Sequence, residues 1–427
     1  MVTVVAAGPA CSVGRSRLGP AAPQPARDVP TAAPEPAGRP PVRDPEAPRR
    51  VTLLELFFDL VYVAALALIS RNLVGSVTWE RAGESLVMLM AIWWTWAITT
   101  LVTDIYDPQR TEIKLLIVAV MFGALLMTTA IPEAFGARGL VFAGTYVAIH
   151  LGRGLFLMPA VRRHPQSNKR ALRIFVWFAV SAVPWLVGAL AAHGTARLLL
   201  WFGALAIDYL GFRLAYPVPV LGAVPDSQRN VTAEHLSERY QQFFIIALGD
   251  AVLVAGTVFS LHHSEVENLV AFTVAFATTL LLWRIYVHKS GELLPHAIAR
   301  ADRPNRFLNT APYTHLLMVA GVVTTAAGFD LVLLEPNGHT PPAWLAVILG
   351  GPALFLTGRA AFEYEVFSRV SSSRPGGVLA LLTIAPAGLY LAPVHTSAGA
   401  TLVLAGVAFA DYRRSRGRPP EEPMPPH

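Results

Sequence analysis

Long apolar stretches recur along the 427-residue chain, and each is about as long as a membrane-spanning helix. A helix needs roughly 20 apolar residues to cross the hydrocarbon core, because each residue adds ~1.5 Å to its length. By that criterion we expect twelve spans, at residues 52–70, 83–103, 113–132, 139–159, 172–192, 196–216, 236–260, 267–288, 311–333, 343–362, 376–394 and 396–412. The sequence therefore predicts an all-α fold, a polytopic transmembrane helix bundle.

The composition agrees with a lipid-embedded chain and excludes several classes of function. The chain is 54% hydrophobic and 15% charged, whereas about a quarter of the residues in soluble domains are charged. Its single cysteine, Cys11, lies outside the apolar stretches, so we expect no disulfide framework and no metal–thiolate site. The sequence has no phosphate-binding glycine loop, nucleophile elbow or zinc-binding His-Glu motif. It therefore predicts no catalytic residue, no metal and no cofactor.

Basic residues indicate the orientation of the chain in the membrane. Lys and Arg are enriched in cytoplasmic loops, and here they concentrate in every second loop and at both ends. The opposite side would hold only Arg71, Arg81, Arg138 and Arg197. We therefore expect a bacterial plasma-membrane protein with both termini in the cytoplasm. The net charge of +6 reflects this topology and not nucleic-acid binding.

The predicted spans divide into two halves. Residues 1–48 are rich in Pro, Ala and Arg and are expected to form a disordered cytoplasmic tail. Residues 49–216 and 217–412 would hold six helices each, and 413–427 would be a second tail. One constant offset places Glu55 on Glu238 and Ala64 on Ala247, which suggests two parallel repeats whose first helices face each other. Pro386 and Pro393 leave open whether 376–412 makes two spans or a re-entrant pair.

The first span carries two carboxyl groups, Glu55 and Asp59, one helical turn apart. An ionisable side chain in a membrane costs at least ~2.5 kcal/mol, so it is usually paired, buried in protein and functional. Glu55 has a second interpretation, because a carboxylate at a helix start also interacts favourably with the helix dipole. Asp59 lies deeper and is therefore the stronger candidate for function.

Further charged residues lie at matching depth in other spans. His235, Glu238, Arg239 and Gln242 form one polar stripe at the start of span seven, from which Arg239 could reach Glu55 or Asp59. We expect one layer of charges that pair with one another, because an unpaired buried charge is costly. Its members would be Glu55, Asp59, His150, Arg153, Asp208, Arg213, Glu238 and Arg239, with Asp250 deeper in span seven. Such a layer could also be purely structural.

Three segments carry a resemblance to a known family. Leu54-Glu-Leu-Phe-Phe-Asp-Leu-Val-Tyr-Val63, His235-Leu-Ser-Glu-Arg239 and Ile245-Ile-Ala-Leu-Gly-Asp250 resemble the bacterial low temperature requirement A (LtrA) family of integral membrane proteins. The resemblance extends over residues 50–412. It implies a multi-pass membrane protein needed for growth in the cold, and it implies no defined activity, substrate or oligomeric state. In the family, the position that matches Asp250 is commonly Glu.

Three functions fit the sequence. The favoured one is proton- or ion-coupled transport of a small solute, with Asp59, Asp250, Glu55 and Glu238 exchanging protons and Arg153 and Arg239 binding an anionic group. The second is a structural or sensing protein whose charges only fix helix packing. The third is a lipid-modifying enzyme that uses His150 or His235 as an acid or base. The lipid bilayer and an unidentified small solute or ion are the expected partners.

Overall fold

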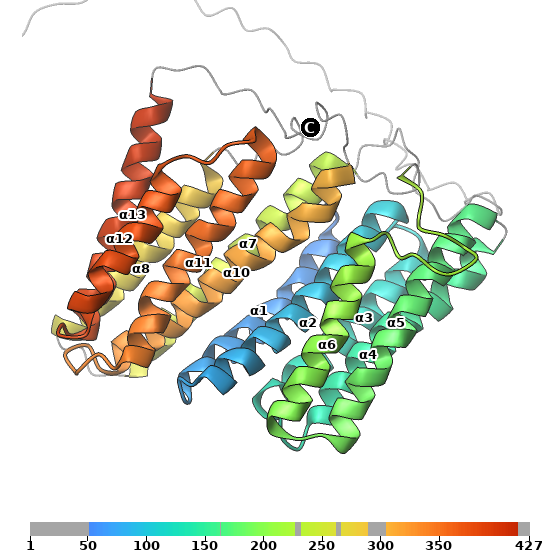
Figure 1. Cartoon of the computed structure of the whole chain (residues 1–427), viewed down its shortest axis with the longest axis horizontal. Coiled ribbons are helices and arrows are strands. Elements are labelled where there is room, and N and C mark those ends of the chain that lie inside the picture. The colour runs from blue at the N-terminus through green and yellow to red at the C-terminus, as the bar shows by residue number, and fades with distance from the viewer. Residues whose placement is uncertain (1–50, 163, 227–231, 262–265, 289–304, 417–427) are drawn as a thin grey trace, which may run out of the picture. The chain divides into compact units, whose positions relative to one another are not determined.

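The computed structural model describes residues 51–162, 164–226, 232–261, 266–288 and 305–416. Within these ranges it contains the α-helices and the single 3-10 helix (η1) that are listed next (Figure 1). They are α1 (Leu53–Val74), α2 (Trp79–Ile105), α3 (Thr111–Ala130), η1 (Ile131–Glu133), α4 (Gly139–Val161), α5 (Pro165–Ala191), α6 (Gly194–Arg213), α7 (Ala233–Leu261), α8 (Val266–Val287), α10 (Asn305–Leu334), α11 (Pro342–Phe367), α12 (Ser373–Gly388) and α13 (Pro393–Ser415). Eleven of the α-helices are long and apolar enough to span a membrane, which confirms the predicted polytopic helical fold. The predicted tail 1–48 and residues 417–427 lie outside the described ranges.

Helix α12 is the exception in length. It has 16 residues, or about 24 Å at ~1.5 Å per residue, against a hydrocarbon core of ~30 Å. It contains Pro386 near its C-terminal end, and α13 begins with Pro393 at its first position. Proline cannot donate the backbone hydrogen bond that would continue a helix, but it suits a helix start. The predicted span 376–394 is therefore shortened, whereas α13 is long enough to cross and extends past residue 412.

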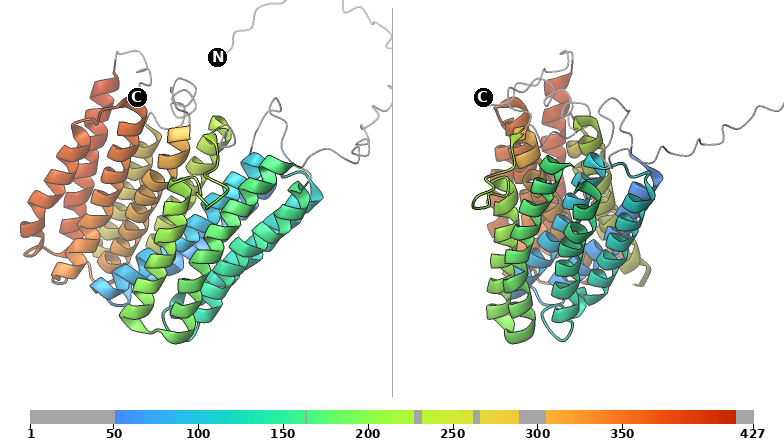
Figure 2. Two further views of the ribbon diagram at one scale, coloured as in Figure 1. Left: turned by 45° about the vertical axis from the view of Figure 1, so that its right-hand side comes forward. Right: turned by 90° about the vertical axis from the view of Figure 1, so that its right-hand side faces the viewer.

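The helices run side by side, and α1, α7 and α10 lie between two groups (Figures 1 and 2). On one side α3, α4, α5 and α6 pack in sequence order and α2 contacts α6; on the other, α8, α11, α12 and α13 pack together. Helices α1 and α2 each contact both α7 and α10. The expected contact between the first helices of the two halves is thus confirmed, and the duplication itself stays a prediction.

Burial differs strongly between helices. Helices α2 and α10 are the most deeply buried of the candidate spans, and α5 is the least. Large apolar side chains such as Leu60, Phe122 and Leu402 are exposed on the outer faces, as expected for surfaces that contact lipid. Helices α10 and α11 approach closely at Gly321 and Gly351, where an added Cβ would collide with the backbone of the other helix. These glycines are packing contacts.

Candidate functional site

Helices α1 and α7 lie side by side, parallel and in register. Two hydrogen-bonded pairs across their interface have the same separation of 180 positions in the chain: Asp59 with Arg239, and Glu55 with His235. Farther along, Ser70 interacts with Asp250 at the same separation. A constant separation arises only when both helices advance in the same direction by the same rise. The α1–α7 interface therefore brings together most of the ionisable residues that the sequence placed in these two spans.

Asp59 and Arg239 form a two-point ion pair. The Arg239 Nη2 donates to Asp59 Oδ1 at 2.6 Å, and Nη1 donates to Oδ2 at 2.7 Å. The indole Nε1 of Trp96 in α2 donates to the same Oδ1 at 2.8 Å. Arg239 Nη1 also donates to the carbonyl oxygen of Glu55 at 3.0 Å and to Gln242 Oε1 at 3.2 Å. The predicted reach of Arg239 to Asp59 is confirmed.

Aromatic side chains exclude water from this ion pair. The Arg239 guanidinium lies over the rings of Trp96 and Phe58, 5.7 and 5.9 Å from their centroids. Phe243 packs against Trp96 at 4.5 Å, and both charged side chains are buried. A buried pair of this kind adds little stability relative to apolar residues of similar size. Loss of one partner, however, leaves the other charge buried and unpaired, which is strongly destabilising. The pair therefore fixes α1 and α7 against each other.

His235 lies between two carboxyl groups at the same end of the interface. Its Nε2 is 2.9 Å from Glu55 Oε1, and its Nδ1 is 3.3 Å from Asp104 Oδ1. Glu55 also closes a capping box with Thr52, so it both starts α1 and contacts α7. We call Glu55, Asp59, Asp104, His235 and Arg239 the inner cluster. It connects α1, α2 and α7, and all five side chains are buried.

Asp104 and Trp96 are members of this arrangement that the sequence reasoning missed. The predicted second span ended at residue 103, one position before Asp104, whereas α2 continues to Ile105. A carboxyl at the end of an apolar span was a usable signal. Nothing in the spacing of Trp96 indicates that its N–H faces a carboxylate.

Asp250 lies on the same interface, about 16 Å along α7 from Arg239 at ~1.5 Å per residue. Its side chain is fully buried, and neither carboxyl oxygen makes a hydrogen bond of good geometry. The Ser70 hydroxyl of α1 is near enough to contribute weak hydrogen-bond stabilisation and Arg71 acts at longer range, but no cationic group among the described residues forms an ion pair with it. Asp250 thus differs from Asp59, although both are buried between the same two helices.

The expectation of a single, mutually paired charge layer is wrong for the other predicted members. Glu238 and Arg213 are exposed. Asp208 is buried in α6, where its Oδ2 accepts a hydrogen bond from the Tyr146 hydroxyl at 2.8 Å and no arginine pairs with it. The position of a residue along its helix predicts how deep it lies in the membrane, but it does not predict which helix lies beside it. Groups at equal depth can therefore lie at separate interfaces.

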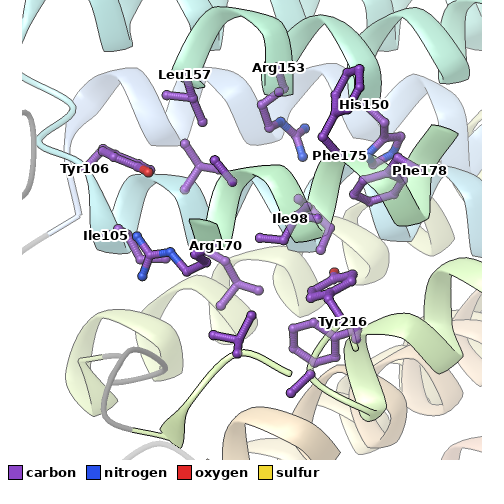
Figure 3. A pocket seen from close by; sticks show the side chains of 18 residues that line it. Ile98, Ile105, Tyr106, His150, Arg153, Leu157, Arg170, Phe175, Phe178 and Tyr216 are labelled. Atoms are coloured by element: carbon purple, nitrogen blue, oxygen red, sulfur yellow. The ribbon is translucent and has the colours of Figure 1, made fainter. Parts of the chain in front are cut away.

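Arg153 in α4 is buried, and no carboxylate in the described part of the chain pairs with it. Its Nη2 donates to Thr99 Oγ1 of α2 at 2.8 Å, whereas Nε and Nη1 make no hydrogen bond. His150, one turn earlier, stacks on Phe178 with 4.2 Å between ring centroids, and neither of its ring nitrogens has a partner. Both residues line a cavity between α2, α4, α5 and α6, and Figure 3 shows the Arg153 guanidinium pointing into it.

That cavity is apolar apart from its basic residues. It has a volume of about 120 Å³, and aromatic rings form much of its lining. These are Tyr106, Phe175, Phe178, Phe212 and Tyr216. Arg170, half-buried in the second turn of α5, also lines it, and no Asp or Glu is among the described lining residues. The charge of Arg153 is therefore not balanced by any acidic side chain among the described lining residues.

A second buried ionic group, which the sequence did not predict, joins α11, α12 and α13. Arg374 in the first turn of α12 lies between Asp411, 2.8 Å from its Nη1, and Glu363, 3.5 Å from its Nε. Ser371 donates to Glu363. Arg374 lies between the predicted spans 343–362 and 376–394, so the sequence gave no sign of its burial. These contacts join three helix ends, as the inner cluster does for α1, α2 and α7.

Comparisons with known proteins agree with this architecture. Residues 50–409 match the family model described as bacterial low temperature requirement A protein (LtrA). An uncharacterized protein of Rhizobium meliloti (strain 1021) is 37% identical over 323 residues, which cover 74% of this chain and 77% of the relative. No solved structure shows significant similarity. This chain therefore belongs to the bacterial low temperature requirement A family of integral membrane proteins.

Proposed function

We propose that the chain is a proton-coupled carrier of a small solute, in which Asp250 carries the proton. The supporting observation is a fully buried carboxyl group without an ion-pair partner among the described residues. An ionised carboxylate in such surroundings is costly, whereas its protonated form is far cheaper to bury. Asp250 therefore binds a proton in this conformation and releases it when water reaches the α1–α7 interface.

The inner cluster acts as the closed gate in this proposal. It ties α1, α2 and α7 together at one end of the interface, which the distribution of basic loops assigns to the cytoplasmic side. Carriers alternate between two arrangements of helix groups around a site near the membrane centre. Separating α1 from α7 would break the Asp59–Arg239 pair and expose Asp250 to water. Both termini are then cytoplasmic, and the membrane is the bacterial plasma membrane.

A structural or sensing role is the second candidate, and one observation favours it. Each ionisable group of the inner cluster already has a partner inside the protein, so none of them needs a ligand to remain buried. A lipid-modifying activity receives less support. It requires a histidine beside a carboxyl group in an open cleft, and His235 has the carboxyl groups but is fully buried.

Proteoliposomes test the proposal directly. Purified protein would be reconstituted into vesicles containing the pH dye pyranine, and pools of amino acids, sugars and organic acids would be added outside. We expect at least one pool to drive proton movement with the wild type, and this movement to disappear in Asp250→Asn. Empty vesicles and the exposed-site variant Glu238→Gln are the controls. If no pool moves protons, or if Asp250→Asn moves them as fast as the wild type, the proposal is wrong.

A further inference from the structure

The Arg153 cavity has the features of a ligand site that is separate from the α1–α7 interface. A guanidinium that is about 95% buried normally pairs with a carboxylate, because an unpaired charge inside a membrane protein is costly. Among the described residues, Arg153, with 5% exposure, has one hydroxyl partner instead; its Nε and Nη1 make no hydrogen bond, and its guanidinium points into the cavity (Figure 3). These free donors match the two oxygens of a carboxylate.

We propose that this cavity binds a small, apolar carboxylic acid in its anionic form, with the carboxylate on Arg153. The nearby charges favour an anion, since the Arg153 guanidinium lines the cavity and no acidic side chain is among its described lining residues. The sides of the cavity favour an apolar body, because Phe175, Phe178 and Tyr216 cover them with aromatic rings. His150, with two unused ring nitrogens, lies one turn from Arg153 and is placed to hydrogen-bond the same carboxylate.

The volume of the cavity limits the size of this ligand. A cavity of about 150 Å³ holds a molecule the size of benzene, so a cavity of about 120 Å³ holds about five or six non-hydrogen atoms. Butyrate and isobutyrate are of this size, whereas a phospholipid with two acyl chains is far too large. The inference is independent of the proposed transport, since binding requires only the cavity as it stands.

The test is equilibrium binding to the full-length protein in lipid nanodiscs. Titrations would use butyrate and isobutyrate, with butyramide and isobutyramide as uncharged analogues of nearly the same shape. We expect saturable binding of both acids and at least tenfold weaker binding of both amides. Equal affinity for acid and amide would overturn the proposal, because the buried charge would then contribute nothing. Octanoate binding at least tenfold more tightly than butyrate would overturn the assigned size.

Two variants locate the site, and a third is the control. Arg153→Met should weaken butyrate binding at least tenfold, because it removes the cation that holds the carboxylate. Ala171→Leu adds apolar volume to the lining without changing charge, and it should weaken binding by a similar factor. Gly152→Leu lies beside Arg153 in α4, but its side chain would enter open space, so binding should be unchanged.

Interpretation does not depend on any single variant folding. The size-exclusion profile of each variant would be compared with that of the wild type before titration. If Arg153→Met does not fold, Ala171→Leu decides, because it leaves every charge in place. Wild-type affinity in a folded Arg153→Met or Ala171→Leu would show that the acids bind elsewhere, which would overturn the proposal.

Discussion

Arg239 and Arg153 are both buried in the interior of this protein, but their surroundings differ. Arg239 makes a two-point ion pair with Asp59, accompanied by Trp96 and Gln242, and lies under aromatic rings. Arg153 has one hydroxyl partner and points into a cavity. The first arrangement satisfies the charge internally and holds helices together. The second leaves the charge available to a ligand.

The carboxyl groups of the α1–α7 interface show the same contrast. Asp59 accepts hydrogen bonds from Arg239 and Trp96, whereas Asp250 makes no hydrogen bond of good geometry. Burial alone therefore does not identify a functional charge in a membrane protein. A buried charge that is already paired inside the protein has a packing role, whereas one without such a partner is available for binding. The four predictions below test that distinction.

Arg239→Met should have the largest effect on stability. It leaves Asp59 buried without a counter-ion, and breaking a buried pair in this way costs about 3 to 5 kcal/mol. Thermal unfolding in detergent would measure the loss as a lower apparent melting temperature. The exposed-site variant Arg213→Met is the control and should melt with the wild type. A loss below about 1 kcal/mol would mean that the pair does not hold α1 against α7.

Trp96→Phe should come next. It keeps an aromatic ring in place but removes the N–H that donates to Asp59, and hydrogen bonds to charged groups contribute about 1.5 to 3 kcal/mol. Trp93→Phe is a matched control, because Trp93 is buried in the same helix and its N–H has no hydrogen-bond partner. Equal destabilisation by the two variants would show that ring size, and not the hydrogen bond, is responsible.

Arg153→Met should change stability in the opposite direction to Arg239→Met. It removes a buried charge that has no counter-ion, so we expect the unfolding free energy to rise by about 1 kcal/mol, as at other sites where function opposes stability. The comparison uses the same replacement and the same melting assay for both arginines. A loss of several kcal/mol would indicate that Arg153 is structural.

Asp250→Asn should have the smallest effect on stability. Asparagine resembles a protonated aspartate in shape and charge, so the unfolding free energy should change by less than about 1 kcal/mol. Asp59→Asn, by contrast, should be destabilising because it removes the charge that Arg239 needs. Unfolding of the two variants under identical conditions tests this. Similar losses would remove the distinction between the two carboxyl groups.

The sequence was sufficient for much of the fold and for part of the site. Span length and the positions of prolines predicted most of the helices, because crossing a membrane imposes a narrow range of lengths. The one-turn spacing of Glu55 and Asp59, and of His235 and Arg239, predicted that each pair lies on one face of its helix. These predictions succeeded because each depends on local geometry alone.

Features that depend on which helices are neighbours were not predictable. Arg153 and Asp208 lie at separate interfaces. The position of a residue along its span predicts its depth in the membrane but not which helix lies beside it. Asp104 was left out of the predicted site because the end of a predicted span is uncertain by one or two residues. The cavity arises from side chains of four helices, so no single segment contains a signal for it.

The central claim is that a buried charge paired inside the protein serves packing, whereas one without such a partner serves binding. Carbodiimide labelling of the wild-type protein in its membrane tests this claim most directly. Dicyclohexylcarbodiimide reacts with protonated carboxyl groups in apolar surroundings, and peptide mass spectrometry identifies the modified residues. We predict modification of Asp250, while Asp59, held as a carboxylate by Arg239, stays unmodified under the same conditions. Modification of Asp59 as fast as Asp250, or of Asp59 alone, would contradict the account.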